Sequence, residues 1–305
     1  MFDEERVGAS TMAAFIGAVI LGGGNFLAVR ISNQELPPFW GAGLRFGIAG
    51  LVFVGIALSL RLRWPRGRQA LLIAIYGLVS FTLSYALMYW ALVRVTAGMV
   101  AVLLAVVPLV TPILAAAHRV ERLSRRNLLG ALVALGGIVV MTVGPEGLLM
   151  PLGGLTAVGI AAVTIGESVI IGKRVSVNHP AMTNAIAMPV GSIGLLVISA
   201  LAGEQWATPH QSEVIWSLVY LVALGSVGLF VLFLLVVRKW TASGTAYAFV
   251  LFPVVTLLLE ALLFDEALSP RAILGAIVVM GAVWFGALAQ PAKVRVGAAP
   301  DPATG

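Results

Sequence analysis

The feature that most constrains this chain is a succession of apolar runs, each long enough to cross a lipid bilayer as a helix. A spanning helix needs about 20 mostly apolar residues, because a hydrocarbon core about 30 Å thick is crossed at about 1.5 Å per residue. We count ten such runs, joined by short connections, over residues 11–29, 38–60, 70–93, 96–117, 127–143, 152–172, 180–201, 214–237, 242–264 and 271–289. The sequence therefore predicts an all-α membrane protein with ten transmembrane helices.

The low charge content supports a lipid environment. Only 10% of the 305 residues are charged and 60% are hydrophobic, whereas soluble domains carry about 25% charged residues. The net charge of +6 would suit a nucleic-acid partner, but Lys and Arg also gather in the cytoplasmic connections of membrane proteins. We therefore expect a lipid bilayer and no nucleic acid as partner. The chain has no cysteine and only three scattered histidines, so no metal site or cofactor is expected.

The basic residues are distributed unequally between the two sides of the predicted bundle. Fifteen Lys and Arg residues lie at the termini and in the even-numbered connections, whereas the odd-numbered connections hold only Arg30, Arg94 and Arg271. Such an asymmetry predicts that the basic side, with both termini, is cytoplasmic.

Residues 92–138 recur without gaps 145 positions later. Pro108 aligns with Pro253 and Gly136 with Gly281, and a weaker match at an offset of 142 pairs Gly24 with Gly166. Each copy would hold five spans, an odd number, so the second copy enters the membrane from the opposite side. Inverted repeats are typical of transporters, because one packing arrangement read in two orientations provides two access states. A passive channel could share this symmetry.

The repeat divides the chain into three parts. We expect a first five-helix repeat over residues 1–148, a second, inverted one over 149–290, and a disordered tail over 291–305, where Gly, Ala, Pro and Asp accumulate.

The repeated segments resemble a known signature. Its residues are Ala91-Leu92, Ala97, Pro108, Glu121-x-Leu123-Ser124 and Leu129-Gly130-Ala131, and again Ala242, Pro253, Glu266-x-Leu268-Ser269 and Leu274-Gly275-Ala276. This pattern resembles the doubled EamA signature of the drug/metabolite transporter superfamily, and the chain is most similar to the YddG-type bacterial amino-acid exporters. The resemblance implies a transporter of the bacterial inner membrane that exports solutes through a central cavity between the two halves. We expect a monomer.

Sites in such transporters lie near the midplane, where helices are interrupted by Gly or Pro. Gly23, Gly24 and Asn25 mark the first span, and Pro108 and Pro253 mark the fourth and ninth. A proline frees a backbone carbonyl, which could accept from a substrate ammonium. The alternative for both prolines is a packing kink.

Charged residues inside spans are costly and mark function or pairing. Glu167 could recognise a substrate amine or carry a proton, or it could pair with a nearby cation or backbone group. Arg45 could hold a substrate carboxylate by a forked contact, extend its head group to the interface, or form a gate ion pair.

Aromatic residues provide further candidates. Phe81, Tyr85 and Tyr89 lie at i, i+4 and i+8 and so share one helical face, which would form either an aromatic wall of the cavity or a packing stripe. Tyr247 and Asn184 are additional lining candidates. Gly43 and Gly47 have the GxxxG spacing of closely packed helices.

The expected function is export of neutral amino acids, including aromatic ones, by alternating access. The alternative is a polyspecific exporter of drug-like cations or other small metabolites, with Glu167 as counter-ion. An intramembrane enzyme would need a converging set of acids, bases or metal ligands. Glu167, Glu260 and Arg45 are expected at different depths, so no enzymatic activity is predicted.

Overall fold

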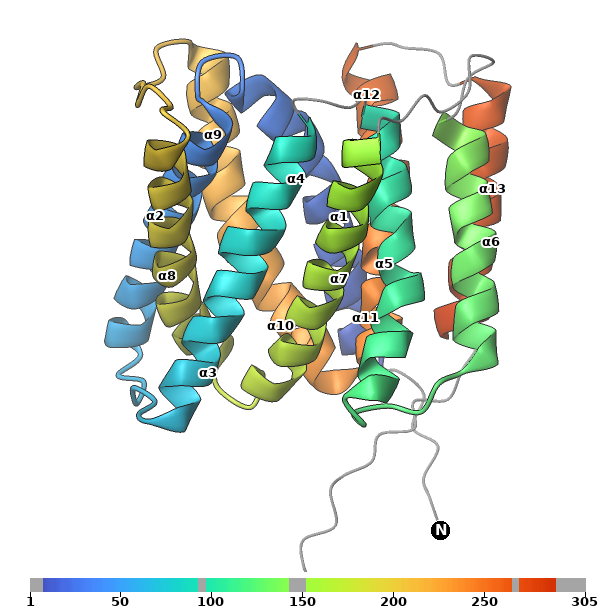
Figure 1. Ribbon diagram of the computed structural model, residues 1–305, viewed down its shortest axis with the longest axis horizontal. Coiled ribbons are helices and arrows are strands. Elements are labelled where there is room, and N and C mark those ends of the chain that lie inside the picture. The colour runs from blue at the N-terminus through green and yellow to red at the C-terminus, as the bar shows by residue number, and fades with distance from the viewer. Residues whose placement is uncertain (1–7, 93–96, 143–151, 265–268, 289–305) are drawn as a thin grey trace, which may run out of the picture.

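The computed structural model describes residues 8–92, 97–142, 152–264 and 269–288, and within these ranges the regular structure is entirely helical. The helices lie side by side along one direction and form a single bundle (Figure 1). Among the described connections, residues 33–37 and 202–211 lie at the upper face in Figure 1, and residues 60–67 lie at the lower face.

The helices follow one another with short connections. They are α1 (Ala9–Ser32), α2 (Pro38–Ser59), α3 (Arg68–Gly77), η1 (Leu78–Leu83), α4 (Ser84–Leu92), α5 (Ala97–Ala117), α6 (Arg125–Thr142), α7 (Leu152–Val175), α8 (Pro180–Leu201), α9 (Ser212–Val222), η2 (Ala223–Gly228), α10 (Leu229–Lys239), α11 (Ala242–Ala246), α12 (Ala248–Phe264), α13 (Pro270–Val283) and η3 (Trp284–Leu288).

Seven helices in the described ranges are long and apolar enough to cross a membrane. They are Ala9–Ser32, Pro38–Ser59, Arg68–Trp90, Pro180–Leu201, Ser212–Lys239, Ala242–Leu263 and Pro270–Ala287. Large apolar side chains point outward from the bundle, for example Leu201 at 83% exposure and Leu262 at 78%, as lipid-facing positions do. A multi-pass membrane protein follows from these helices, and the count of ten spans stays a prediction.

Three of the long helices contain a π-helical segment. The helix Arg68–Trp90 includes η1, the helix Ser212–Lys239 includes η2, and the helix Pro270–Ala287 ends within η3. The segments Leu78–Leu83 and Ala223–Gly228 lie 145 positions apart, which is the offset of the sequence repeat. Single π-turns are rare and occur frequently at functional sites.

Glycines bring one group of helices into close contact. The GxxxG pair Gly43 and Gly47 packs α2 against α8, as its spacing predicts: an added Cβ would lie 2.7 Å from Leu196 and 3.0 Å from the Ser192 hydroxyl, respectively. The Ser192 hydroxyl also donates to the carbonyl of Gly43 at 2.7 Å. Helix α3 packs on the same partner, because an added Cβ at Gly77 would lie 2.4 Å from the α8 backbone. Helices α2, α3 and α8 thus form one tightly packed block.

Helices α6 and α13 pack together at the other side of the bundle (Figure 1). There the Cβ of an alanine at Gly130 would lie 2.6 Å from the Cα of Gly286. Between these two groups lie α1, α5, α7, α10 and α12, which pack on one another and leave a cavity near the middle of the bundle.

Candidate functional site

A cavity of about 80 Å³ lies among α1, α2, η1, α4, α7, α10 and α12. This is several times the space that one water needs, so the cavity has room for a small solute. Most of its wall is apolar, and its polar lining residues are Asn25, Arg45, Ser80, Ser84, Tyr85 and Ser168. Small-molecule binding sites are typically of this kind: most of the lining is apolar, and a few polar groups fix the orientation of the ligand.

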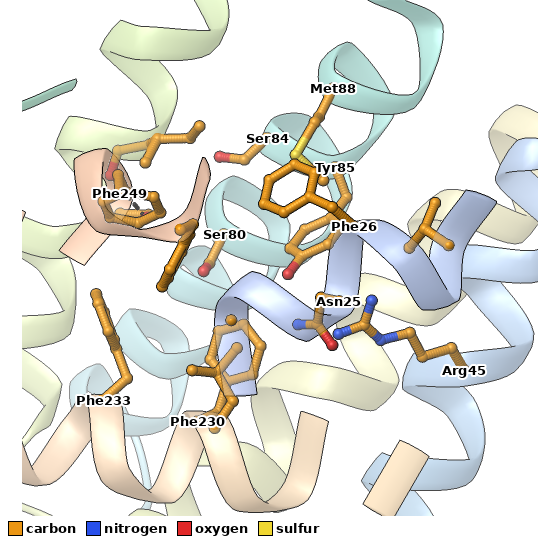
Figure 2. A pocket seen from close by; sticks show the side chains of 16 residues that line it. Asn25, Phe26, Arg45, Ser80, Ser84, Tyr85, Met88, Phe230, Phe233 and Phe249 are labelled. Carbon is orange, nitrogen blue, oxygen red and sulfur yellow. Dashed lines mark hydrogen bonds between the residues drawn. The ribbon is translucent and has the colours of Figure 1, made fainter. Parts of the chain in front are cut away.

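Phenylalanines from three helices form a continuous aromatic wall. Ring centroids are 6.4 Å apart for Phe230 and Phe233, 6.0 Å for Phe233 and Phe249, and 5.4 Å for Phe249 and Phe252. Phe26 of α1 extends the series at 6.5 Å from Phe252. Aromatic pairs in such edge-to-face arrangements contribute about 0.5–1.5 kcal/mol beyond their buried area, so the wall is a defined surface that can contact a flat apolar group (Figure 2).

This aromatic wall was not predicted from the sequence. The signal that could have indicated it is the i, i+3 spacing of Phe230 with Phe233 and of Phe249 with Phe252, which places each pair on one helical face.

Arg45 lies at the opposite end of the cavity from Phe233 and Phe249 (Figure 2). Its side chain is 0% exposed, so the interpretation that its head group extends to the interface is wrong. The Nε donates to the hydroxyl of Ser226 at 2.7 Å and Nη2 donates to the carbonyl of Gly225 at 2.7 Å. Both partners belong to the π-helical segment η2, and neither could be identified from the sequence near Arg45.

Asn25 shares one of these partners. Its Nδ2 donates to the carbonyl of Gly225 at 3.1 Å. The sequence thus selected two residues, Asn25 and Arg45, that the structure brings together at one end of the cavity.

Tyr85 lines the cavity, with Phe81 and Tyr89 on either side along the same helical face. The ring centroid of Tyr85 lies 6.5 Å from that of Phe81 and 6.3 Å from that of Tyr89. Phe81 and Tyr89 themselves are buried in the helix packing and do not line the cavity. Of this aromatic stripe, Tyr85 is the member that can contact a solute in this conformation.

Glu167 does not line the cavity. Its Oε1 lies 2.9 Å from Nε2 of His118, and both side chains are partly exposed. Of the interpretations offered for Glu167, pairing with a nearby cation is therefore the one that the geometry favours.

The other candidates lie in packing positions. Tyr247 donates its hydroxyl to the carbonyl of Asn127 at 2.6 Å, which joins it to α6. Asn184 is fully buried, and neither polar atom of its amide has a hydrogen-bond partner in the described part of the chain. Neither side chain lines the cavity.

The glycines proposed as helix interruptions lie at close helix contacts, whereas the proposed prolines lie inside helices away from the cavity. An added Cβ at Gly23 would lie 2.5 Å from Val255, and one at Gly24 would lie 2.1 Å from the Tyr220 hydroxyl, so both glycines permit close approach of α1 to its neighbours. Pro108 and Pro253 lie inside α5 and α12, and neither lines the cavity.

Two charged side chains hold helix ends beyond the cavity. Glu121 accepts from the backbone N–H of Ala242 and, at 2.6 Å, from the hydroxyl of Ser243, so it caps the start of α11. Lys173 donates to the carbonyl of Val237 at 2.7 Å and to that of Trp240. Carboxylates at helix N-termini and cations at C-termini also complement the helix dipole. These contacts tie α5, α7, α10 and α11 together at one end of the bundle.

Comparison with known proteins identifies relatives over nearly the whole chain. The model of the EamA-like transporter family matches twice, over residues 9–143 and 152–287. The chain is 28% identical over 260 residues to the uncharacterized inner membrane transporter YedA of Escherichia coli K12, covering 84% of this chain and 83% of that protein. It is 26% identical over 273 residues to a probable terminal-alkyne amino-acid exporter of Streptantibioticus cattleyicolor, covering 86% and 88%.

A solved crystal structure has the same fold. The two superimpose with a TM-score of 0.77 at 19% sequence identity, covering 93% of this chain and 98% of the other. The helix arrangement in Figure 1 is therefore one that occurs in an experimentally determined protein.

Proposed function

The chain belongs to the EamA-like transporter family, and from this premise we propose that it exports neutral amino acids, including aromatic ones, through the cavity between its two halves. Members of this family are membrane transporters and not enzymes, so the chemistry required of the cavity is recognition and release of a solute.

The observation that carries this proposal is the unequal lining of the cavity. One end presents Arg45 and Asn25, and the remaining lining is mostly apolar and includes five phenylalanines. A neutral amino acid is divided in the same way: its ammonium and carboxylate lie at one end, and its apolar or aromatic side chain lies at the other. The printed name of the S. cattleyicolor relative, a probable amino-acid exporter, agrees with this substrate class.

Alternating access would follow from two inverted five-helix repeats. The packing supports this arrangement, because the contacts between the halves come in matched pairs: α1 of the first half packs against α12 of the second, and α7 of the second half packs against α5 of the first. Helices α2 and α8 would be equivalent elements in contact with each other, as would α6 and α13. The shared 145-residue offset of η1 and η2 supports the same symmetry.

We place the protein in the bacterial inner membrane as a monomer with both termini cytoplasmic. The name of the YedA relative, an inner membrane transporter, supports the location. The excess of Lys and Arg at the termini and in the even-numbered connections supports the orientation.

Export of drug-like cations is the competing function, and the cavity gives it less support. Glu167, its expected counter-ion, pairs with His118 away from the cavity. The charged residue that lines the cavity is Arg45, which would repel a cation.

The test is solute exchange by the purified protein in liposomes. Vesicles loaded with unlabelled phenylalanine should accumulate external radiolabelled phenylalanine, and an excess of tyrosine or leucine should compete, whereas protein-free vesicles should not exchange. Uptake of a cationic dye without exchange of any amino acid would refute amino-acid export and favour export of drug-like cations.

A further inference from the structure

The strongest unexplained feature of the cavity is a buried guanidinium without a negative partner. Arg45 is fully buried, and no carboxylate in the described part of the chain lies within ion-pair distance of it. The guanidinium is 4.9 Å from the ring centroid of Phe46 and 5.6 Å from that of Tyr85. The phenol hydroxyls of Tyr85 and Tyr89 lie close enough to the guanidinium to interact with it electrostatically and through their oxygens. These neighbours are neutral, so they weaken the charge imbalance without removing it.

The hydrogen bonds of Arg45 orient the guanidinium and leave one nitrogen free. Nε and Nη2 are held by Ser226 and Gly225, as described above, whereas Nη1 is buried and has no hydrogen-bond partner. Anchoring two of the three nitrogens fixes the plane of the head group. Nη1 is therefore the nitrogen of this fixed head group that still has donors for an anionic acceptor.

Asn25 has an acceptor atom without a donor, which complements the free donors of Arg45. Its Nδ2 is used by the carbonyl of Gly225, and its Oδ1 is buried without a hydrogen-bond partner. The two residues lie at the same point of η2, because a Cβ built on Gly225 would be 1.9 Å from Oδ1 of Asn25 and 3.4 Å from Nη2 of Arg45. The guanidinium that carries a free donor and the amide that carries a free acceptor thus adjoin at one end of the cavity.

A buried charge is strongly unfavourable until an opposite charge joins it, and buried polar atoms without partners are rare. An α-amino acid would satisfy both atoms at once, since its carboxylate accepts from a guanidinium and its ammonium donates to an amide oxygen. Its side chain would then extend from this end of the cavity toward Phe230 and Phe233 (Figure 2).

We propose that Arg45, through Nη1, and Asn25, through Oδ1, form the recognition site for the carboxylate and the ammonium of a transported amino acid. This inference rests on the proposed function and makes its substrate class narrower: the cavity recognises a free carboxylate, so amines or amides of the same size bind more weakly than the amino acid. The π-helical turn η2 is then the scaffold that positions both recognition groups.

The first experiment uses the unaltered protein in the exchange assay and compares three competitors of labelled phenylalanine. Phenylalanine should compete best. Phenylalaninamide, which lacks the carboxylate, should be weaker by about tenfold or more, because hydrogen bonds between charged groups are the strong class. 3-Phenylpropanoate, which lacks the ammonium, should lie between the two. Equal competition by phenylalanine and its amide would overturn the role of Arg45, and equal competition by 3-phenylpropanoate would overturn that of Asn25.

The second experiment assigns the selectivity to Arg45. The ratio between the concentrations of phenylalaninamide and of phenylalanine that halve the uptake of labelled phenylalanine should fall toward one in R45Q. Arg126 offers a matched control, because its Nε donates to the carbonyl of Phe285 at 2.7 Å and its guanidinium lies 4.6 Å from the Phe285 ring centroid, away from the cavity. R126Q should keep the ratio of the unaltered protein. An R45Q protein that still discriminates against the amide would refute the assignment, and if R45Q does not fold, the competitor series decides alone.

The exchange assay distinguishes failure of the proposed function from failure of the recognition site alone. Exchange of no amino acid would refute the proposed function and this inference with it. Exchange of phenylalanine with indifference to its carboxylate would refute the inference alone.

Discussion

Substitution of Gly77 by alanine tests whether α3 and α8 approach as closely as described. The added Cβ would lie 2.4 Å from the carbonyl oxygen of Ala187 and 2.9 Å from its Cα. Ordinary contacts between non-bonded heavy atoms are about 3.5–4.0 Å, so the helices would have to separate by roughly 1 Å. Both obstructing atoms are backbone, which cannot rotate out of the way as a side chain can.

The expected cost is about 1–3 kcal/mol, the usual range for overpacking a close-packed interior. Replacing glycine by alanine inside a helix also brings a gain of about 0.5–1 kcal/mol. Gly136 of α6 is the matched control, because nothing lies within 4 Å of the Cβ that an alanine would add there. The gain is common to both variants, so G77A should be less stable than G136A by about 1–3 kcal/mol.

The assay is reversible unfolding of the purified protein in mixed micelles, followed by circular dichroism as the proportion of denaturing detergent rises. G136A should unfold at or above the midpoint of the unaltered protein, and G77A below it. Equal midpoints for the two variants would refute the close approach of α3 and α8.

Three further substitutions test the site and its surroundings. Y85A should shift the exchange preference from aromatic toward aliphatic amino acids while expression is retained, because Tyr85 lines the cavity; an unchanged order of competitors would remove Tyr85 from the site. E121A should lower the free energy of unfolding by about 0.5–2 kcal/mol through loss of its hydrogen bonds to the first turn of α11, where Thr241 remains as the N-cap. E213A, at an exposed position in the first turn of α9, should stay within about 0.5 kcal/mol; equal losses in the two variants would contradict the role of Glu121. E167Q should cost less than about 1 kcal/mol, since its pair with His118 is partly exposed, and should preserve amino-acid exchange; loss of exchange would return Glu167 to the transport mechanism.

The helical architecture could be predicted because lipid imposes a simple rule on the sequence. A run such as 38–60 must satisfy its backbone polar groups internally and present apolar side chains to lipid, so its length and composition suffice to identify α2, which spans Pro38–Ser59. The GxxxG pair in α2 could be interpreted equally well, because close approach needs small residues whichever helix is the partner.

The cavity could be predicted only in part, because its geometry depends on contacts between distant residues. Arg45 was identified as a charged residue inside an apolar span, and Asn25 as part of the glycine-interrupted stretch of the first span. Their shared partner, Gly225, lies 180 and 200 positions away. Glu167 was identified by the same rule, and the rule does not tell a residue that faces the cavity from one that pairs with His118. The phenylalanines of α10 and α12 resemble any apolar residues of a membrane helix until the fold brings them together.

The π-helical turn η1 determines which side chains of the following helix can meet a solute. A π-turn accommodates one residue more than an α-helical turn, and each residue rotates an α-helix by about 100°. Deleting one residue from Leu78–Leu83 would therefore swing the face of α4 that carries Ser84, Tyr85 and Met88 through about a quarter-turn, out of the cavity that it now lines. The lining of the cavity thus depends on the phase of a helix, which a single inserted or lost residue can reset without any change in the side chains themselves.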